Sequence, residues 1–259
     1  MGGAVEFDQI APVYDETRRP PSEIEIQALT EVLAGCRTVL DAGVGTGRFA
    51  VPLRAGQFDV VGVDLSFGMM RRARAKGITT LVRADLRHLP FSDKTVDATF
   101  TAHVLQLIPD PQGVLRELAR VARRVVVVLL PEWSEREPSS GWRELRARYR
   151  ELAAELGYPL PERGRRYRHT LEELSAIAPP KLVRPVEGPS ATGTGLSDWL
   201  ARWEARATCG SQIPPEVHAE IVRRLQLEQP IDPARWARPR IERFVAWDPA
   251  DLKGPSLRS

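Results

Sequence analysis

The sequence predicts a doubly wound α/β fold, in which helices cover both faces of a mostly parallel β-sheet. A glycine-rich turn, Gly43-Val-Gly-Thr-Gly47, joins a β-prone run to a helical segment, as in a strand, turn and helix crossover. Between residues 22 and 131, β-prone runs alternate with helical segments, which is typical of parallel strands joined by helices. The run Val125–Leu130 is wholly apolar, as expected for a strand that is buried on both faces of its sheet.

Local signals mark the ends of the predicted elements. Ser22 can cap a helix with Glu25 at its third position, and Ser66 can cap another that stops at Gly77. Asp110 precedes a proline at the first helical position, which favours a helix start. The predicted elements are, in chain order, a helix at 22–34, a strand at 38–40, a helix at 48–54, a strand at 58–63, a helix at 66–76, strands at 78–82 and 96–101, a helix at 110–121 and a strand at 124–130.

The pattern changes beyond Pro131, where the segments become rich in arginine, glutamate and aromatic residues. Such segments suit a lid or cap over a core domain. The expected elements are a helix at 133–157, a basic loop at 159–168, a helix at 170–178, a strand at 181–187, helices at 197–207 and 214–227, and a closing strand at 238–247.

Composition is that of a folded globular protein, with 259 residues, of which 42% are hydrophobic and 27% charged. A net charge of +3 does not by itself imply nucleic-acid binding. Cys36 and Cys209 are too far apart for a local metal knuckle and no metal-ligand spacing occurs, so we expect no metal and a reducing, cytoplasmic compartment. We expect no membrane insertion, because residues 1–20 lack an apolar signal core and the longest aliphatic run is too short to cross a bilayer.

The glycine turn and Asp64 together predict a nucleoside-binding site. Asp64 ends the second strand, where a carboxylate can accept hydrogen bonds from two ribose hydroxyls. A dinucleotide site has the spacing G-x-G-x-x-G and would place glycine where this chain has Arg48. The observed spacing, Gly43-x-Gly45-x-Gly47, better suits a zwitterionic methionine tail, which carries no pyrophosphate. It therefore favours S-adenosylmethionine over NAD, although an NAD-dependent oxidoreductase is kept as an alternative.

Residues 7–131 resemble the class I S-adenosylmethionine-dependent methyltransferases, in particular the ubiquinone/menaquinone-biosynthesis branch. The resemblance is carried by the segments Phe7–Asp15, Leu40–Gly47, Val63–Ser66, Ala84–Asp85, Leu89–Phe91, Val96–Asp97 and Leu107–Asp110. It implies a Rossmann-like sheet of seven strands, the last antiparallel, with a helical cap formed by insertions. We expect one domain over 1–259, with a cofactor-binding core at about 22–131, cap insertions at about 132–178 and 190–235, and a closing strand at about 238–247. The family's usual Lys-Pro-Gly-Gly turn before strand five is absent here.

The resemblance also implies roles for individual residues. By it, three glycines line the methionine moiety, Asp64 holds the ribose, Asp85 accepts from the adenine amino group, and Tyr14 closes over the cofactor. The three glycines are Gly43, Gly45 and Gly47. The resemblance also implies that three residues pack on the purine: Leu65, Met69 and Leu86.

Three more residues follow from their chemistry and position, each with a structural alternative. Asp41 can interact with the cofactor amine or satisfy turn amides, and Arg18 can pair with the cofactor carboxylate or be solvated. His103 follows strand four at the carboxyl end of the sheet, where it can orient the acceptor or take its proton, or be structural.

The predicted function is methyl transfer from S-adenosylmethionine to a small-molecule acceptor, with S-adenosylhomocysteine as product and no metal. The aromatic residues of the insertions can line the acceptor pocket or pack the cap; they are Trp133, Trp142, Tyr149, Tyr158, Trp199 and Trp203. A tRNA-modifying methyltransferase is an alternative if the arginines of 163–169 share a surface with Arg123 and Arg124, and a solvated loop is the simpler reading of that run. A catalytically silent cofactor-binding regulator is a further alternative. No motif names the acceptor atom or the oligomeric state.

Overall fold

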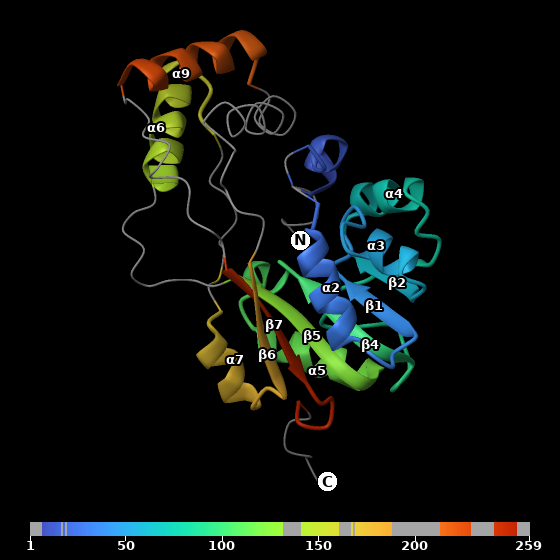
Figure 1. The fold of residues 1–259 in the computed structure, drawn as a ribbon. Coiled ribbons are helices and arrows are strands. Elements are labelled where there is room, and N and C mark those ends of the chain that lie inside the picture. Colours follow the sequence, from blue (N-terminus) through green and yellow to red (C-terminus); the bar gives the residue numbers. More distant parts are fainter. Residues whose placement is uncertain are drawn as a thin grey trace.

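The computed structural model describes residues 7–16, 18, 20–131, 141–160, 167, 169–187, 213–228 and 241–252. Within these ranges, seven strands form one sheet in the order β3-β2-β1-β4-β5-β7-β6 (Figure 1). The strands are β1 Thr38–Ala42, β2 Asp59–Asp64, β3 Leu81–Arg83, β4 Val96–Ala102, β5 Ala122–Pro131, β6 Leu182–Glu187 and β7 Ile241–Trp247. Strands β1 to β5 pair in parallel, whereas β7 is antiparallel to both β5 and β6. The predicted sheet, with its antiparallel last strand, is confirmed.

Helices cover both faces of this sheet because successive side chains of each strand point to opposite sides. Along β5, Val127 and Leu129 pack in one core with Leu29, whereas Val126 and Val128 pack in another with Leu118. Leu29 belongs to a helix on the first face and Leu118 to a helix on the second. The elements around the sheet are η1 Ala11–Val13, α2 Glu23–Val32, α3 Ala50–Ala55, α4 Phe67–Ala75, η2 Leu105–Leu107, α5 Pro111–Val121 and α7 Leu171–Ile177.

The predicted helix signals have the expected geometry. Ser22 Oγ accepts the Glu25 N–H at 3.2 Å, and the Glu25 carboxylate accepts the Ser22 N–H at 2.7 Å, which completes a capping box on α2. The third strand differs from the prediction, since it begins at Leu81 and not at Ile78. The Ile78 N–H donates to Ala73 O at 3.1 Å, so Ile78 is held against the end of α4 and its N–H is not used in the sheet.

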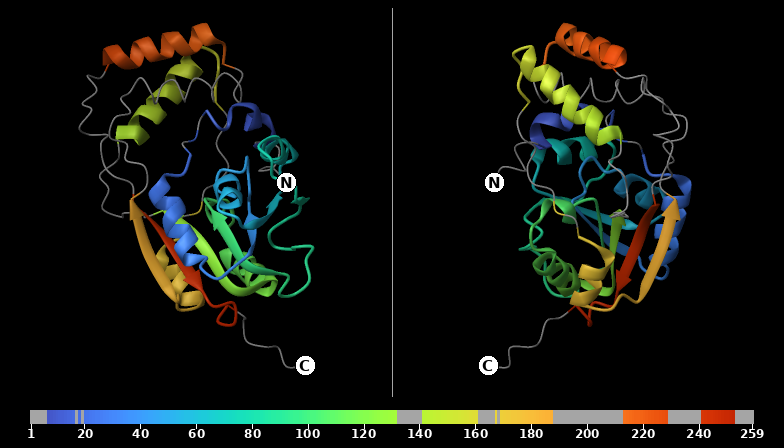
Figure 2. Two further views of the ribbon diagram at one scale, coloured as in Figure 1. Left: turned by 45° about the vertical axis from the view of Figure 1, so that its right-hand side comes forward. Right: turned by 90° about the vertical axis from the view of Figure 1, so that its left-hand side faces the viewer.

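Two further helices, α6 Gly141–Glu155 and α9 Pro215–Glu228, pack against each other away from the sheet. Arg148 of α6 donates to both carboxylate oxygens of Glu228 at 2.7 Å. Figure 1 and Figure 2 both place the pair beyond the end of the sheet at which β7 begins. Of the other predicted cap elements, the helix at 197–207 and most of the loop at 159–168 lie outside the described residues. None of the described helices is both long and apolar enough to span a membrane.

Candidate functional site

The glycine turn lies where β1 ends, in the middle of the sheet. Gly43, Gly45 and Gly47 have φ angles of 84°, 54° and 84°, which side chains rarely permit. A Cβ atom on Gly43 would also lie 2.2 Å from Cγ2 of Val104, in the loop that follows β4. Glycine is therefore required at position 43 both by backbone conformation and by the close approach of the β4 loop.

Asp64 joins this turn to the end of β2. Its carboxylate accepts the N–H groups of Gly45 and Ser66, each at 2.8 Å. Burial raises the pKa of Asp64, although hydrogen bonds from the Ser66, Gly45 and Leu65 amides oppose the rise. A carboxylate has about four lone-pair sites, so Asp64 can still accept from a bound ligand.

Asp41 is a buried acid beneath the turn, with 3% of its surface exposed. Burial raises its pKa to about 7, and the negative charge of Asp64 adds to the rise. The backbone N–H of Ala50, at the start of α3, donates to the Asp41 carboxylate. The Asp41 carboxylate therefore accepts from an amide at the helix start, and it lies near a second acid.

The N-terminal segment, residues 7–18, is fixed against the same region by two carboxylates. Asp8 accepts from Ser66 Oγ at 2.6 Å and from the Gly68 N–H at 2.7 Å. Asp15 accepts from Thr46 Oγ1 at 2.6 Å and pairs with Lys76 at 2.7 Å. Sequence reasoning did not assign either acid, because their partners lie far along the chain.

Two predicted residues belong to this segment. The Arg18 guanidinium lies 5.2 Å from the centre of the Tyr14 ring, a cation–π contact. Met69, predicted to pack on the purine, is 2% exposed and packs with Ile10 and Ala11 of the N-terminal segment. The structure thus brings Tyr14 and Met69 into one apolar cluster, with Arg18 against the Tyr14 ring.

The residues predicted to bind adenine follow β2 and β3. Leu65 is 45% exposed, whereas Leu86 is buried. The Arg87 side chain donates to both oxygens of Asp85, with the shortest contact at 2.5 Å, and holds the pKa of that carboxyl below its usual value. Asp85 is therefore already occupied by an arginine that the sequence prediction did not consider.

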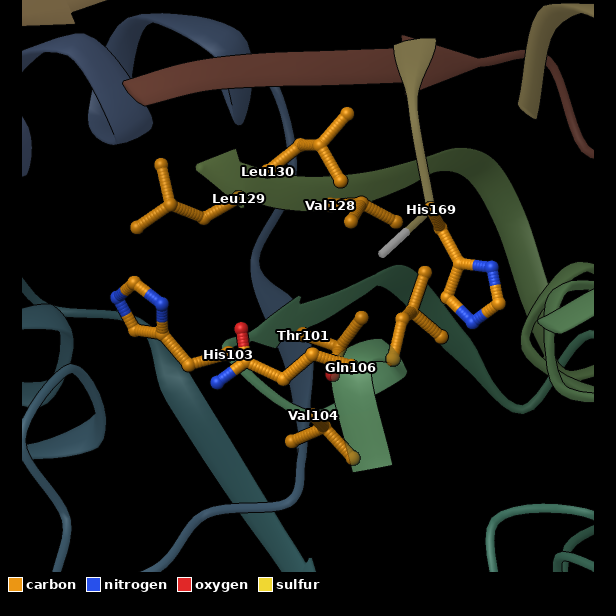
Figure 3. Close-up of a pocket in the computed structure, with 9 residues that line it drawn as sticks. Thr101, His103, Val104, Gln106, Val128, Leu129, Leu130 and His169 are labelled. Atoms are coloured by element: carbon orange, nitrogen blue, oxygen red, sulfur yellow. The ribbon is translucent and has the colours of Figure 1, made fainter. Parts of the chain in front are cut away.

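His103 is placed at the carboxyl end of β4, as predicted. It has a φ angle of 59°, which is uncommon outside glycine, and its Nε2 atom lies 3.6 Å from Oε2 of Glu242 on β7. Figure 3 shows His103 beside a pocket whose wall includes Val128, Leu130 and Gln106. Glu242 is a site residue that sequence reasoning missed, because nothing in its local pattern distinguishes it from a solvated strand residue.

Arg48 is a second residue that sequence reasoning did not assign to the site. Its Nε atom is buried and has no hydrogen-bond partner in the part of the chain that the structure describes. Burial lowers the pKa of its guanidinium, which also interacts electrostatically with Tyr14, Arg18, Glu25 and Glu242. Its position directly after the glycine turn was the sequence signal that could have assigned Arg48 to the site.

The aromatic and basic residues of the insertions are only partly described. Tyr149 is fully buried between α6 and α9, where its hydroxyl lies 2.7 Å from Nδ1 of His218, so this aromatic packs the cap. Tyr158 is 37% exposed. The positions Trp133, Trp199, Trp203 and 163–166 lie outside the described residues.

Known proteins are similar to this chain over the region that contains the glycine turn and Asp64. A family model described as a methyltransferase domain matches residues 40–129. The ubiquinone/menaquinone biosynthesis C-methyltransferase UbiE of Syntrophotalea carbinolica is 36% identical over 142 residues, which cover 50% of this chain and 60% of that protein. The chain spans 60% or less of the length of the curated relatives that it matches.

Solved structures share the fold at low sequence identity. A Thermotoga maritima protein described as a possible histamine N-methyltransferase has a TM-score of 0.51 and 24% identity, over 71% of this chain and 84% of that one. Phosphoethanolamine N-methyltransferase 2 of Haemonchus contortus, in complex with S-adenosyl-L-methionine, has a TM-score of 0.53 and 17% identity, over 95% of this chain and 56% of that one. These similarities establish the architecture of the sheet and its helices.

Proposed function

We propose that this chain, a class I S-adenosylmethionine-dependent methyltransferase similar to the ubiquinone/menaquinone branch, transfers a methyl group from S-adenosylmethionine to a small-molecule acceptor. The link between Asp64 and the turn at Gly45, at 2.8 Å, carries the proposal. It holds a half-buried carboxylate beside three glycines in left-handed conformations. A carboxylate so placed can accept from two ribose hydroxyls. The family match over 40–129 includes the whole arrangement.

The residues around the turn fit the methyl donor in charge and shape. We assign the ribose to Asp64, the adenine amino group to Asp85, and the purine faces to Leu65 and Leu86. We assign the methionine moiety to the turn itself, whose three glycines have left-handed backbone conformations and carry no side chains. The amine and carboxylate of that moiety are assigned to the acidic and basic side chains nearby, Asp41 and Arg18.

The donor supplies a methyl group that its sulfonium already activates, so the protein has to align the acceptor and exclude water. The N-terminal segment suits the second task, because Asp8 and Asp15 fasten it over the start of α4 and the glycine turn. His103 suits the first, because it lies beside a pocket at the carboxyl end of β4. In our proposal Tyr14 closes over the donor and His103 orients the acceptor.

Binding measurements with S-adenosylhomocysteine, S-adenosylmethionine and NAD test the donor. We expect both sulfur compounds to raise the melting temperature and NAD to leave it unchanged. Asp64→Asn should weaken S-adenosylhomocysteine about 10- to 100-fold, the range expected when a hydrogen bond to a charged group is lost. Asp59→Asn, at the exposed start of β2, is the matched control and should bind as the wild type does. Stabilisation by NAD alone would overturn the proposal.

A transfer assay separates an enzyme from a silent binding protein. Methyl-labelled S-adenosylmethionine is incubated with a small-molecule extract, and label in new products is recorded with wild type and Asp64→Asn. We expect labelled small molecules with the wild type only. Label in RNA, with RNA binding that weakens steeply as salt is raised, would instead support the tRNA-modifying alternative.

A further inference from the structure

We propose that Glu242 is a positioning residue that holds His103 as the proton acceptor of the reaction, and that the methyl acceptor presents an O–H or N–H group to His103. The proposal rests on the methyl transfer proposed above. It deepens that proposal by naming the chemical class of the acceptor and a residue from the end of the chain.

Sheet topology brings the two residues together. Ala102, the last residue of β4, pairs with Leu129 of β5, and Glu242 of β7 pairs with Pro131 at the end of the same strand. His103 and Glu242 therefore lie at the same end of the sheet, on the two sides of β5. The measured distance from His103 Nε2 to Glu242 Oε2 is 3.6 Å.

Burial makes the position of Glu242 unusual. Its side chain is 4% exposed, whereas that of His103 is 21% exposed. Glu242 lies on the same face of β7 as Phe244 and Ala246, which pack in the apolar core on the α2 and α3 face. A buried carboxylate is costly unless cationic or hydrogen-bonding groups compensate it. The imidazole of His103 and the guanidinium of Arg48 are two groups that compensate it.

The pocket beside His103 adjoins the glycine turn. Val104, which lines the pocket, is the residue that approaches Gly43 most closely. The Oε1 atom of Gln106 is buried there and has no hydrogen-bond partner among the described residues. In Figure 3 the Gln106 amide extends toward the His103 side of the pocket. A ligand with an O–H or N–H donor would satisfy this oxygen, whereas a wholly apolar ligand would leave it unpaired.

These positions suit a methyl transfer in which the acceptor loses a proton to His103. A lone pair of the acceptor oxygen or nitrogen forms the new bond to the methyl carbon, and the S–CH₃ bond breaks with its electron pair retained on sulfur. The proton leaves the acceptor for Nδ1 of His103, the ring nitrogen opposite the one that faces Glu242. The resulting imidazolium is stabilised by the Glu242 carboxylate and later releases the proton to solvent.

Charged groups from several elements influence the protonation of His103. Glu242 faces the imidazole from β7, and Arg48 interacts with Glu242 from the glycine turn. The same guanidinium interacts with Glu25 of α2 and with Tyr14 and Arg18 of the N-terminal segment. A change at Glu242 must therefore be measured with these groups intact.

Nuclear magnetic resonance of the imidazole rings tests the pair directly, because the chain has only 4 histidines. Ring ¹³C and ¹⁵N signals of the full chain, saturated with S-adenosylhomocysteine, are assigned with His103→Asn and followed between pH 5 and 9. In the wild type we expect neutral His103 to carry its proton on Nε2. In Glu242→Gln the titration midpoint of His103 should fall by about one pH unit or more, since an opposite charge at this distance favours the protonated ring.

Controls and contrary outcomes are defined by the same spectra. The ring signals of exposed His88 should be the same in both proteins, and Glu187→Gln, at the exposed end of neighbouring β6, should leave His103 unchanged. A proton on Nδ1 in the neutral wild type, or an unchanged His103 midpoint in Glu242→Gln, would overturn the positioning role. The tautomer measurement needs no variant, so the proposal stays testable if Glu242→Gln does not fold.

The acceptor class is tested by the products of methyl-labelled donor. New methyl carbons bonded to oxygen or nitrogen support the proposal, and methyl groups bonded only to carbon overturn it. Failure of S-adenosylhomocysteine to bind would instead contradict the proposed function, and it is measured independently of the histidine signals.

Discussion

Asp41 should make the stability of this protein decrease as the pH rises from acidic to mildly alkaline values. The carboxyl group is 3% exposed, and burial with the nearby charge of Asp64 raises its pKa from 3.8 to about 7. In the unfolded chain the group ionises near 3.8, so between these two values the folded state holds a proton that the unfolded state has released. Stability is therefore lost as the pH rises through this window and levels off above about 7.

The magnitude follows from the two pKa values. Each pH unit inside the window costs about 1.4 kcal/mol, so the free energy of unfolding should fall by about 2.5 kcal/mol between pH 5 and pH 8. Asp64 adds to the same trend, because its pKa is also raised. Asp41→Asn removes the Asp41 contribution and keeps an oxygen that can accept the Ala50 N–H.

Urea unfolding at pH 5 and pH 8 measures the effect. We expect Asp41→Asn to lose markedly less stability than the wild type between the two pH values, by about 2 kcal/mol. Asp59→Asn, an exposed acid on β2, should keep the wild-type pH dependence. The reasoning is refuted if Asp41→Asn and the wild type lose the same free energy over this interval.

Three further predictions concern the frame of the site. Asp97 accepts the Arg37 and Thr38 amides at 2.9 Å and has its pKa lowered to about 2 by these bonds, so Asp97→Asn should cost about 1–3 kcal/mol in urea unfolding at pH 7. That contribution of Asp97 should disappear in the wild type as the pH falls from about 4 to about 2, and acid unfolding curves that coincide for the two proteins would contradict it. Gly43→Ala should lower the melting temperature and the affinity for S-adenosylhomocysteine. Adding Val104→Ala should restore only the loss that is due to the clash with Val104, since the φ angle of 84° is unaffected. Full restoration by Val104→Ala would exclude backbone strain at position 43. Arg87→Ala should tighten S-adenosylhomocysteine binding by up to about fivefold in calorimetry, because it frees Asp85 from an exposed ion pair; weaker binding would show instead that Arg87 itself holds the ligand.

Local signals were sufficient to predict most of the elements. The capping pair Ser22 and Glu25 and the start of α5 at Pro111 are each encoded within a few residues, and the structure has them as expected. The glycine turn is equally local, because left-handed backbone angles at three alternating positions require the residue without a side chain. The third strand was placed too early, since a hydrogen bond to the end of α4 retains Ile78.

The sequence by itself determined the order of strands and helices, the glycine turn and the position of Asp64 at the end of β2, because each depends on spacing between near neighbours. Only the tertiary structure decided which distant side chains meet: Asp8 with Ser66, Arg87 on Asp85, and His103 with Glu242. The last pair depends on β7 lying antiparallel next to β5, which places the start of a late strand at the carboxyl end of earlier ones. Such contacts follow from strand order and register across the whole sheet, and no short stretch of sequence contains that information.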